Sequence, residues 1–194
     1  QCKEAGVKFV CVDPFYTPTA KVLTDDYIPI RPGTDSAAFL AMAYVLLTQD
    51  DPENNPLIDW DFLDRCTIGF DADHLPEGAD PKKNYRDYVL GTYDGVPKTP
   101  EWASEICGSP AEDLERLALM LGGERAAVIT APALARTGSG AQLCQNLMAF
   151  GAMAGLIGKP GCCCASDCGH SWMQGGFETL LKGGMNHANP RNAT

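Results

Sequence analysis

The feature that most constrains the fold is a short apolar run, Val7 to Val12, that Asp13 and Pro14 follow at once. A nearly unbroken apolar segment of this length is typical of a parallel strand that is buried on both faces. The Asp-Pro pair then ends the strand, because proline has no N–H for the ladder. We therefore expect a central strand of a mainly parallel sheet here.

The rest of the chain alternates between helix and strand patterns. Thr34, Thr99 and Ser109 each precede a helix pattern and are predicted to cap it. The predicted helices lie around 18–23, 35–49, 60–66, 85–90, after 99–100 and 109–110, and at 142–157, and further strands lie at 27–30 and, buried, at 126–131. This order predicts an α/β fold with a mainly parallel sheet and helices on both faces, a Rossmann-like, dinucleotide-binding-like domain.

Composition divides the chain into a domain and a tail. Residues 1–160 form the predicted α/β cofactor-binding domain, with a polar helical excursion at about 50–97 that is rich in Pro, Asn, Asp and Gly. Residues 161–194 are predicted to be an irregular tail that packs on a neighbouring domain. Because the chain opens at Gln1 on what resembles the end of a helix, we expect an internal fragment of a longer protein.

The charge of the chain limits its partners. A formal net charge of −10 argues against nucleic acid and against an anionic membrane surface, since both select a basic face. A bound phosphate group is compatible with this charge, because backbone N–H groups and helix N-termini can hold it. No apolar stretch approaches the roughly eighteen residues that span a bilayer, so we expect no direct membrane contact.

Two loops are the first candidate site. They are Asp13-Pro14-Phe15-Tyr16-Thr17 and Arg31 to Asp35. An acidic residue at a strand end, such as Asp13, can accept hydrogen bonds from both hydroxyls of a ribose. Gly33 lets backbone approach a flat base, and Asp35 can accept from the N1–H and amine edge of guanine. The alternative is that Asp13 only starts a turn, and that Thr34 and Asp35 only cap a helix.

The nine cysteines do not indicate a disulfide scaffold, because their number is odd and the chain is too large to need one. Four of them lie within apolar patterns and are predicted to be small core residues: Cys11, Cys66, Cys107 and Cys144. A second group offers soft metal ligands: Cys162, Cys163, Cys164, Cys168, His170 and His187. Its spacing does not fit zinc or an iron–sulfur cluster, so no metal site is predicted. No base for a cysteine nucleophile is identifiable, so a catalytic cysteine has little support.

Several strings resemble one family. The segment VDPFYTPTA from Val12 and the segment YIPIRPGTDSA from Tyr27 together resemble a paired motif of the dimethyl sulfoxide reductase family, oxidoreductases that carry molybdenum on two molybdopterin guanine dinucleotides. Residues 109–118 and 154–161 resemble two further segments of that family. Residues 60–66 and 98–103 are most similar to the catalytic subunit of its anaerobic dimethyl sulfoxide reductase branch.

The resemblance has departures. Phe15 stands where the family commonly has arginine. Residues 131–140 differ from the usual glycine- and glutamine-containing loop, although Arg136 fits the arginine of the reductase version. The cysteine-rich tail matches no family segment.

The resemblance implies a cofactor site without catalytic residues or metal ligands in this chain. Asp13 to Thr17 and Gly33 to Asp35 would hold the guanosine part of one dinucleotide, and Pro132 and Arg136 would line the cofactor from another loop. The cysteine cluster for a [4Fe–4S] centre, in a missing N-terminal part, and the molybdenum-ligating serine would lie outside this chain.

The implied parent enzyme is a respiratory molybdenum reductase of dimethyl sulfoxide or a related S- or N-oxide, and the fragment alone would be inactive. Formate or nitrate as the substrate, and a stand-alone α/β nucleotide-binding module, are the alternatives. The implied partners are the remaining domains of the same chain, an iron–sulfur electron-transfer subunit and a membrane anchor subunit. The implied location is the periplasmic or cell-surface face of a bacterial membrane, with the cytoplasm as the alternative.

Overall fold

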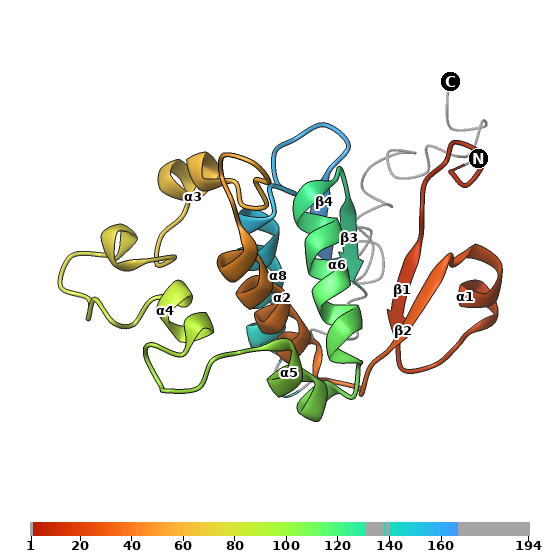
Figure 1. Ribbon diagram of the computed structural model, residues 1–194, viewed down its shortest axis with the longest axis horizontal. Coiled ribbons are helices and arrows are strands. Elements are labelled where there is room, and N and C mark those ends of the chain that lie inside the picture. The colour runs from red at the N-terminus through yellow and green to blue at the C-terminus, as the bar shows by residue number, and fades with distance from the viewer. Residues whose placement is uncertain (1, 131–137, 139, 167–194) are drawn as a thin grey trace, which may run out of the picture.

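The computed structural model describes residues 2–130, 138 and 140–166 (Figure 1). Helices and strands alternate near the two ends of this length, and the elements between residues 35 and 123 are all helices. The helices are α1 (Pro18–Leu23), α2 (Asp35–Gln49), α3 (Trp60–Cys66), the 3-10 helix η1 (Ala72–His74), α4 (Tyr85–Leu90), α5 (Pro100–Cys107), α6 (Ala111–Gly123) and α8 (Gly140–Met153), and the strands are β1 (Val10–Asp13), β2 (Asp26–Pro29), β3 (Ala127–Thr130) and β4 (Cys163–Ser166). The α/β class is confirmed.

The strands form two small parallel sheets, one of β1 with β2 and one of β3 with β4. In the first sheet Asp13 lies opposite Pro29, and in the second Thr130 lies opposite Ser166. Helix α1 connects β1 to β2 on one side of the molecule, and the second sheet lies close to α6 and α8 (Figure 1). Within the predicted tail, residues 163–166 thus form β4, and 167–194 lie outside the described part.

Two predictions about strands are wrong. β1 begins only at Val10, so that Val7 lies before it, and the strand is not buried on both faces, because Val12 is 40% exposed. The strand predicted to be buried at 126–131 is β3, in which Ile129 is 74% exposed. Among the described strands each of these two has one neighbour. An apolar sequence indicates that a strand can be buried, whereas its actual burial depends on the elements that lie next to it.

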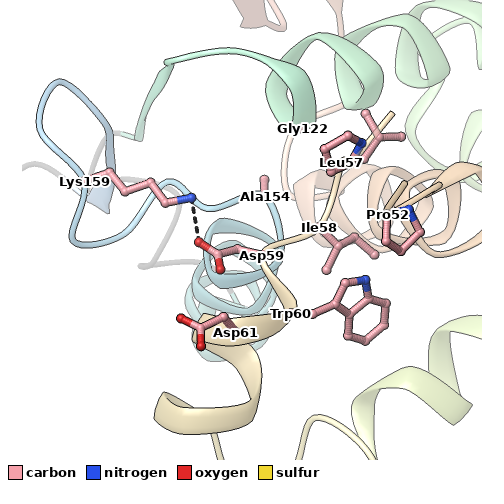
Figure 2. Close-up of a pocket in the computed structure, with 10 residues that line it drawn as sticks. Pro52, Leu57, Ile58, Asp59, Trp60, Asp61, Gly122, Ala154 and Lys159 are labelled. Atoms are coloured by element: carbon pink, nitrogen blue, oxygen red, sulfur yellow. Dashed lines mark ion pairs between the residues drawn. The ribbon is translucent and has the colours of Figure 1, made fainter. Parts of the chain in front are cut away.

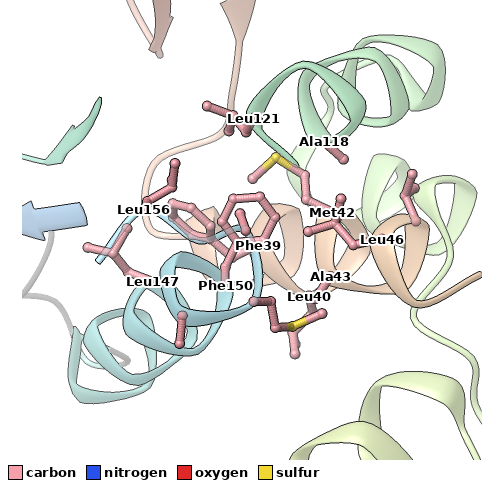
Figure 3. Packing of buried hydrophobic residues seen from close by; sticks show 14 of the residues in the cluster. Phe39, Leu40, Met42, Ala43, Leu46, Ala118, Leu121, Leu147, Phe150 and Leu156 are labelled. Carbon is pink, nitrogen blue, oxygen red and sulfur yellow. The ribbon is translucent and has the colours of Figure 1, made fainter. Parts of the chain in front are cut away.

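The core surrounds α2, as its long apolar sequence predicts. Helices α5, α6 and α8 all pack against it. Figure 3 shows Phe39 of α2 against Phe150 of α8, with ring centroids 5.8 Å apart, and Leu46 of α2 is fully buried. Full burial of an apolar side chain contributes roughly 1.5–3 kcal/mol, so this helix cluster should dominate the stability of the fold.

Polar anchors hold the excursion at 50–97 to the core. Asp50, just after α2, accepts a hydrogen bond from the indole N–H of Trp60 at 2.7 Å. At the other end, the side chain of Lys98 is 2% exposed, and its ammonium group pairs with Asp94 at 2.8 Å and lies 4.2 Å from the ring centroid of Tyr88. Both short helices predicted in this stretch, α3 and α4, are present. None of the helices in the described ranges has the length and apolar character that a membrane span requires.

The caps are partly as predicted. Thr99 accepts a hydrogen bond from the backbone N–H of Trp102 and starts α5. Ser109 does not cap α6: its hydroxyl donates instead to the carbonyl oxygen of Pro29 at 2.6 Å. The capping prediction for Ser109 is wrong, because the N-cap position of α6 is Pro110, one residue later. The cysteine predictions hold for buried Cys107 and fail for Cys66, which is exposed, whereas Cys11 and Cys144 are partly buried.

Candidate functional site

The two candidate loops leave the same edge of the first sheet. β1 and β2 run parallel in register, so their carboxyl ends lie side by side, with Asp13 opposite Pro29. The first loop starts at Asp13, and the second starts two residues after Pro29. In α/β proteins ligands bind outside the carboxyl ends of parallel strands. The structure therefore brings the two predicted loops to one position suited to a ligand.

The first loop is a turn held by Asp13. Its Oδ1 accepts the backbone N–H of Phe15 at 2.8 Å, and its carbonyl oxygen accepts the hydroxyl of Tyr27 at 2.6 Å. Thr17 then caps α1 by accepting the N–H of Ala20 at 3.1 Å. Asp13 does start a turn, as its alternative reading states. Its second carboxylate oxygen has no hydrogen-bond partner among the described residues, so it is free to accept from a ligand.

Two exposed aromatic residues follow Asp13 in the same loop. Phe15 is 74% and Tyr16 59% exposed. The Tyr16 ring meets the Tyr27 ring edge-on, with centroids 5.0 Å apart, so its position is fixed by packing. Burial, and then the charge of Asp13, raise the pKa of Tyr27, which keeps its hydroxyl protonated as a donor. Exposed aromatic rings in this loop offer flat apolar surfaces to a ligand.

The second loop turns at Gly33, which has a φ of +77°. This left-handed conformation strains any residue with a Cβ, although a Cβ there would meet no atom within 4 Å. Backbone geometry, rather than crowding, therefore requires the glycine. Thr34 is the N-cap residue of α2, as predicted, but its side chain makes no cap bond. Its hydroxyl donates instead to the carbonyl oxygen of Arg31 at 2.7 Å.

Asp35 lies in the first turn of α2 and is half-buried. Burial raises the pKa of its carboxyl, and a hydrogen bond from its own backbone N–H opposes this only in part. No other described residue donates a hydrogen bond to it. A desolvated carboxylate that accepts from no other residue gains more from a ligand N–H than a solvated one does.

Sequence reasoning missed the contacts that hold the second loop. Arg31 donates through Nη1 to the carbonyl oxygens of Glu105 and Ile106, at 2.8 and 3.0 Å. Ser109, fully buried, bonds the last residue of β2. These partners are separated by 74 to 80 residues in the sequence, so no local pattern could have indicated them.

The remaining candidate residues fall into two groups, those outside the described residues and the cysteines of β4. Pro132, Arg136, Cys168, His170 and His187 lie outside the described residues. Cys164 is buried, donates to the carbonyl oxygen of Leu147 at 3.2 Å, and has its pKa raised to about 11 by burial. Cys163 is exposed, so the adjacent thiols do not converge. Within the described ranges no group of three or more His, Cys, Asp or Glu side chains could hold a metal ion.

A cleft of about 420 Å³ lies elsewhere (Figure 2). Its polar groups are already paired: Asp59 caps α3 through the N–H of Phe62 at 3.0 Å and binds Lys159 at 2.6 Å. Lys159 lowers the pKa of the Asp59 carboxyl. None of the lining residues belongs to the two loops; they are Pro52, Pro56, Leu57, Ile58, Asp59, Trp60, Asp61, Gly122, Ala154 and Lys159. Because paired groups offer a ligand little, the sheet edge is the better candidate.

Comparisons with known proteins agree on one family. The chain is 40% identical over 129 residues to the dimethyl sulfoxide reductase of Escherichia coli K12, covering 66% of this chain and 15% of that protein. It is 37% identical over 159 residues to the dimethyl sulfoxide/trimethylamine N-oxide reductase of Cereibacter sphaeroides, covering 82% of this chain and 17% of that protein. No protein-family model matches the chain. The chain spans less than a fifth of the length of each of these two relatives.

A solved structure has a similar fold. The acetylene hydratase of Pelobacter acetylenicus matches with a TM-score of 0.61 at 21% identity, over 82% of this chain and 19% of that one. At 21% identity the match supports a similarity of fold alone. It agrees with the α/β class of the described residues.

Proposed function

Because this chain belongs to the dimethyl sulfoxide reductase family of molybdopterin oxidoreductases, we propose that its first sheet edge binds the guanosine part of a molybdopterin guanine dinucleotide. The observation that carries the proposal is the parallel register of β1 and β2, which places both loops at one edge. The unpaired, half-buried carboxylate of Asp35 and the open backbone at Gly33 fit such a group.

Each loop has a distinct role in the proposed site. The free carboxylate oxygen of Asp13 accepts from the ribose hydroxyls, and the carboxylate of Asp35 accepts from the N1–H and amine edge of guanine. Gly33 lets its backbone approach the base closely. Phe15 and Tyr16 offer ring faces to the base or ribose. Pro132 and Arg136, outside the described residues, complete the proposed set, together with the connecting residues Pro14, Thr17 and Thr34.

We propose that the parent enzyme reduces dimethyl sulfoxide or a related S- or N-oxide, which the names of the relatives support. The bound molybdenum–pterin group, taken to be the bis-dinucleotide form, supplies the oxygen-transfer and electron-transfer chemistry. The residues of this chain bind and orient its guanosine end. No catalytic residue and no metal ligand is assigned to the chain, and the [4Fe–4S] cluster is assigned to another part of the parent.

The proposed partners are the remaining domains of the parent chain, an iron–sulfur subunit and a membrane anchor subunit, at the periplasmic face of a bacterial membrane. The exposed side chains of Val12 and Ile129 support the first of these, because parallel sheets are normally covered on both faces. We likewise propose that residues 1–160 form the cofactor-binding domain and that 161–194 pack on a neighbouring domain.

Titration calorimetry of the chain with GMP and AMP tests the guanosine site. We expect GMP to bind more tightly than AMP, and Asp13→Ala to weaken GMP binding about 5- to 150-fold, which is the loss of roughly 1–3 kcal/mol for unpaired ligand donors. Asp80→Ala is a matched control, because Asp80 holds a similar turn by accepting the N–H of Lys82. Equal binding of both nucleotides, or equal effects of both variants, would contradict the proposal.

The same residues can be tested in the full-length enzyme. Asp13→Ala and Asp35→Ala are each expected to lower the molybdenum content of the purified protein, because each leaves donors of the cofactor unpaired. Molybdenum at the content of the unmodified enzyme in both variants would show that these carboxylates do not contact the cofactor.

A further inference from the structure

Arg31 makes contacts unusual for a loop residue. Its backbone N–H donates to the carbonyl oxygen of Cys107 at 2.7 Å, and its Nη1 donates to those of Glu105 and Ile106. These are carbonyls of the last turn of α5, which have no partners within the helix. The helix has no basic residue of its own in that turn. Arg31 therefore supplies both the donors and the positive charge that this helix end favours.

The same junction holds the end of β2 from a second side. The hydroxyl of Ser109 donates to the carbonyl oxygen of Pro29 at 2.6 Å. Gly108 ends α5 with a φ of +75°, and a Cβ there would lie 3.3 Å from Nε of Arg31. The glycine therefore leaves room for the guanidinium. In Figure 1 the end of α5 lies beside the segment that runs from β2 to α2.

The second loop is fastened in turn to Arg31. The hydroxyl and the backbone N–H of Thr34 both donate to the carbonyl oxygen of Arg31, at 2.7 and 3.3 Å. Gly33, between them, has no atom near its Cβ position. The conformation of the turn thus depends on where Arg31 is held, and the end of α5 holds it.

We propose that Arg31 is a positioning residue, which with Ser109 fixes the turn at Gly33–Asp35 in the geometry that receives the nucleotide. This inference rests on the proposed guanosine site and adds to it a residue that does not touch the ligand. The competing role is a direct contact between the guanidinium and a phosphate of the ligand. The two roles differ in whether a phosphate-free ligand is affected.

The test compares Arg31→Met, Arg31→Lys and the control Arg65→Met. Arg65 is also exposed and hydrogen-bonded, to Asp61 of its own helix α3, so its replacement makes the same chemical change away from the site. The probes are guanosine and GMP in calorimetry, and exchange of the Thr34 amide hydrogen in the ligand-free chain. Loss of a charge-assisted hydrogen bond corresponds to roughly tenfold or more in an equilibrium constant, which sets the scale of the effects.

If Arg31 is a positioning residue, Arg31→Met should weaken the binding of guanosine and of GMP by the same factor, about tenfold. The same substitution should speed exchange of the Thr34 amide hydrogen at least about fivefold. Arg31→Lys keeps a charged donor and should recover part of the binding affinity and part of the protection of the Thr34 amide. Arg65→Met should change neither the affinity nor the exchange rate. A loss for GMP alone, or unchanged exchange at Thr34, would overturn the proposal. If the unmodified chain binds neither ligand, the guanosine site fails, whereas the exchange measurement still decides whether Arg31 holds the turn.

Discussion

Replacing Asp35 with asparagine separates recognition of guanine from stability. The substitution keeps the shape of the side chain and its place in the first turn of α2. It replaces one carboxylate oxygen with an amide N–H₂, which would face the N–H groups of guanine instead of accepting from them. The variant therefore loses charge-assisted hydrogen bonds to the base.

The magnitude follows from the surroundings of the carboxylate. Asp35 is half-buried, and no other described residue donates to it. The proposed contact with guanine is therefore its main interaction, and its loss should cost about 1.5–3 kcal/mol, or roughly 10- to 150-fold in Kd. The ratio of the affinities for GMP and for IMP, which lacks the exocyclic amine, should fall toward one.

The folding stability of the Asp35→Asn variant should not fall together with its affinity for GMP. Burial raises the pKa of Asp35, so the folded chain binds a proton more tightly than the unfolded chain, and ionisation of Asp35 opposes folding as pH rises through that window. Urea unfolding at neutral pH should therefore show no loss of stability in Asp35→Asn. An unchanged ratio of GMP to IMP affinity would show that Asp35 does not recognise the guanine edge, and so would weaker GMP binding that follows from a lower unfolding free energy.

Three further predictions concern the fold around the site. Phe150→Ala should lower the unfolding free energy by about 3–5 kcal/mol in urea, because the ring is fully buried against Phe39; a loss below about 1 kcal/mol would contradict this packing. Hydrogen bonding to Asp71, with a smaller contribution from Asp64, raises the pKa of His74. Its stabilisation should therefore be full below the unfolded value of about 6.5 and be lost as pH rises through the folded value, and a His74→Asn chain with an unchanged pH profile of unfolding would exclude this. Gly33→Ala should cost roughly 1–2 kcal/mol, since φ is +77°, and should also weaken GMP binding; calorimetry and urea unfolding that match the unmodified chain would contradict the strained turn.

Local sequence predicted the helices well. Helices α2, α3 and α4 have the predicted bounds, because an apolar pattern or a capping residue such as Thr99 acts over a few neighbours along the chain. The candidate loops were also predictable, since Asp13 and Gly33 each follow a strand pattern and parallel strands end at a common edge.

The environment of the strands and the anchoring of the second loop could not be predicted. The apolar residues of β1 suggested burial, yet Val12 is 40% exposed, because burial depends on neighbours that the local sequence does not specify. Ser109 precedes a helix pattern as a capping residue does, but its hydroxyl donates to Pro29, 80 residues away. Arg31 likewise reaches across 74 residues. Such contacts are set by packing of α5 against α2, which only the folded structure defines.

Mapping amide chemical shifts of the isotope-labelled chain during a titration with guanosine tests the location of the site most directly. We expect the largest shifts at the backbone amides of residues 13 and 15–17 and of Gly33 to Asp35, on both loops at once, with none comparable during a titration with adenosine. Shifts confined to the cleft around Asp59 and Trp60, or shifts of equal size with both nucleosides, would contradict it.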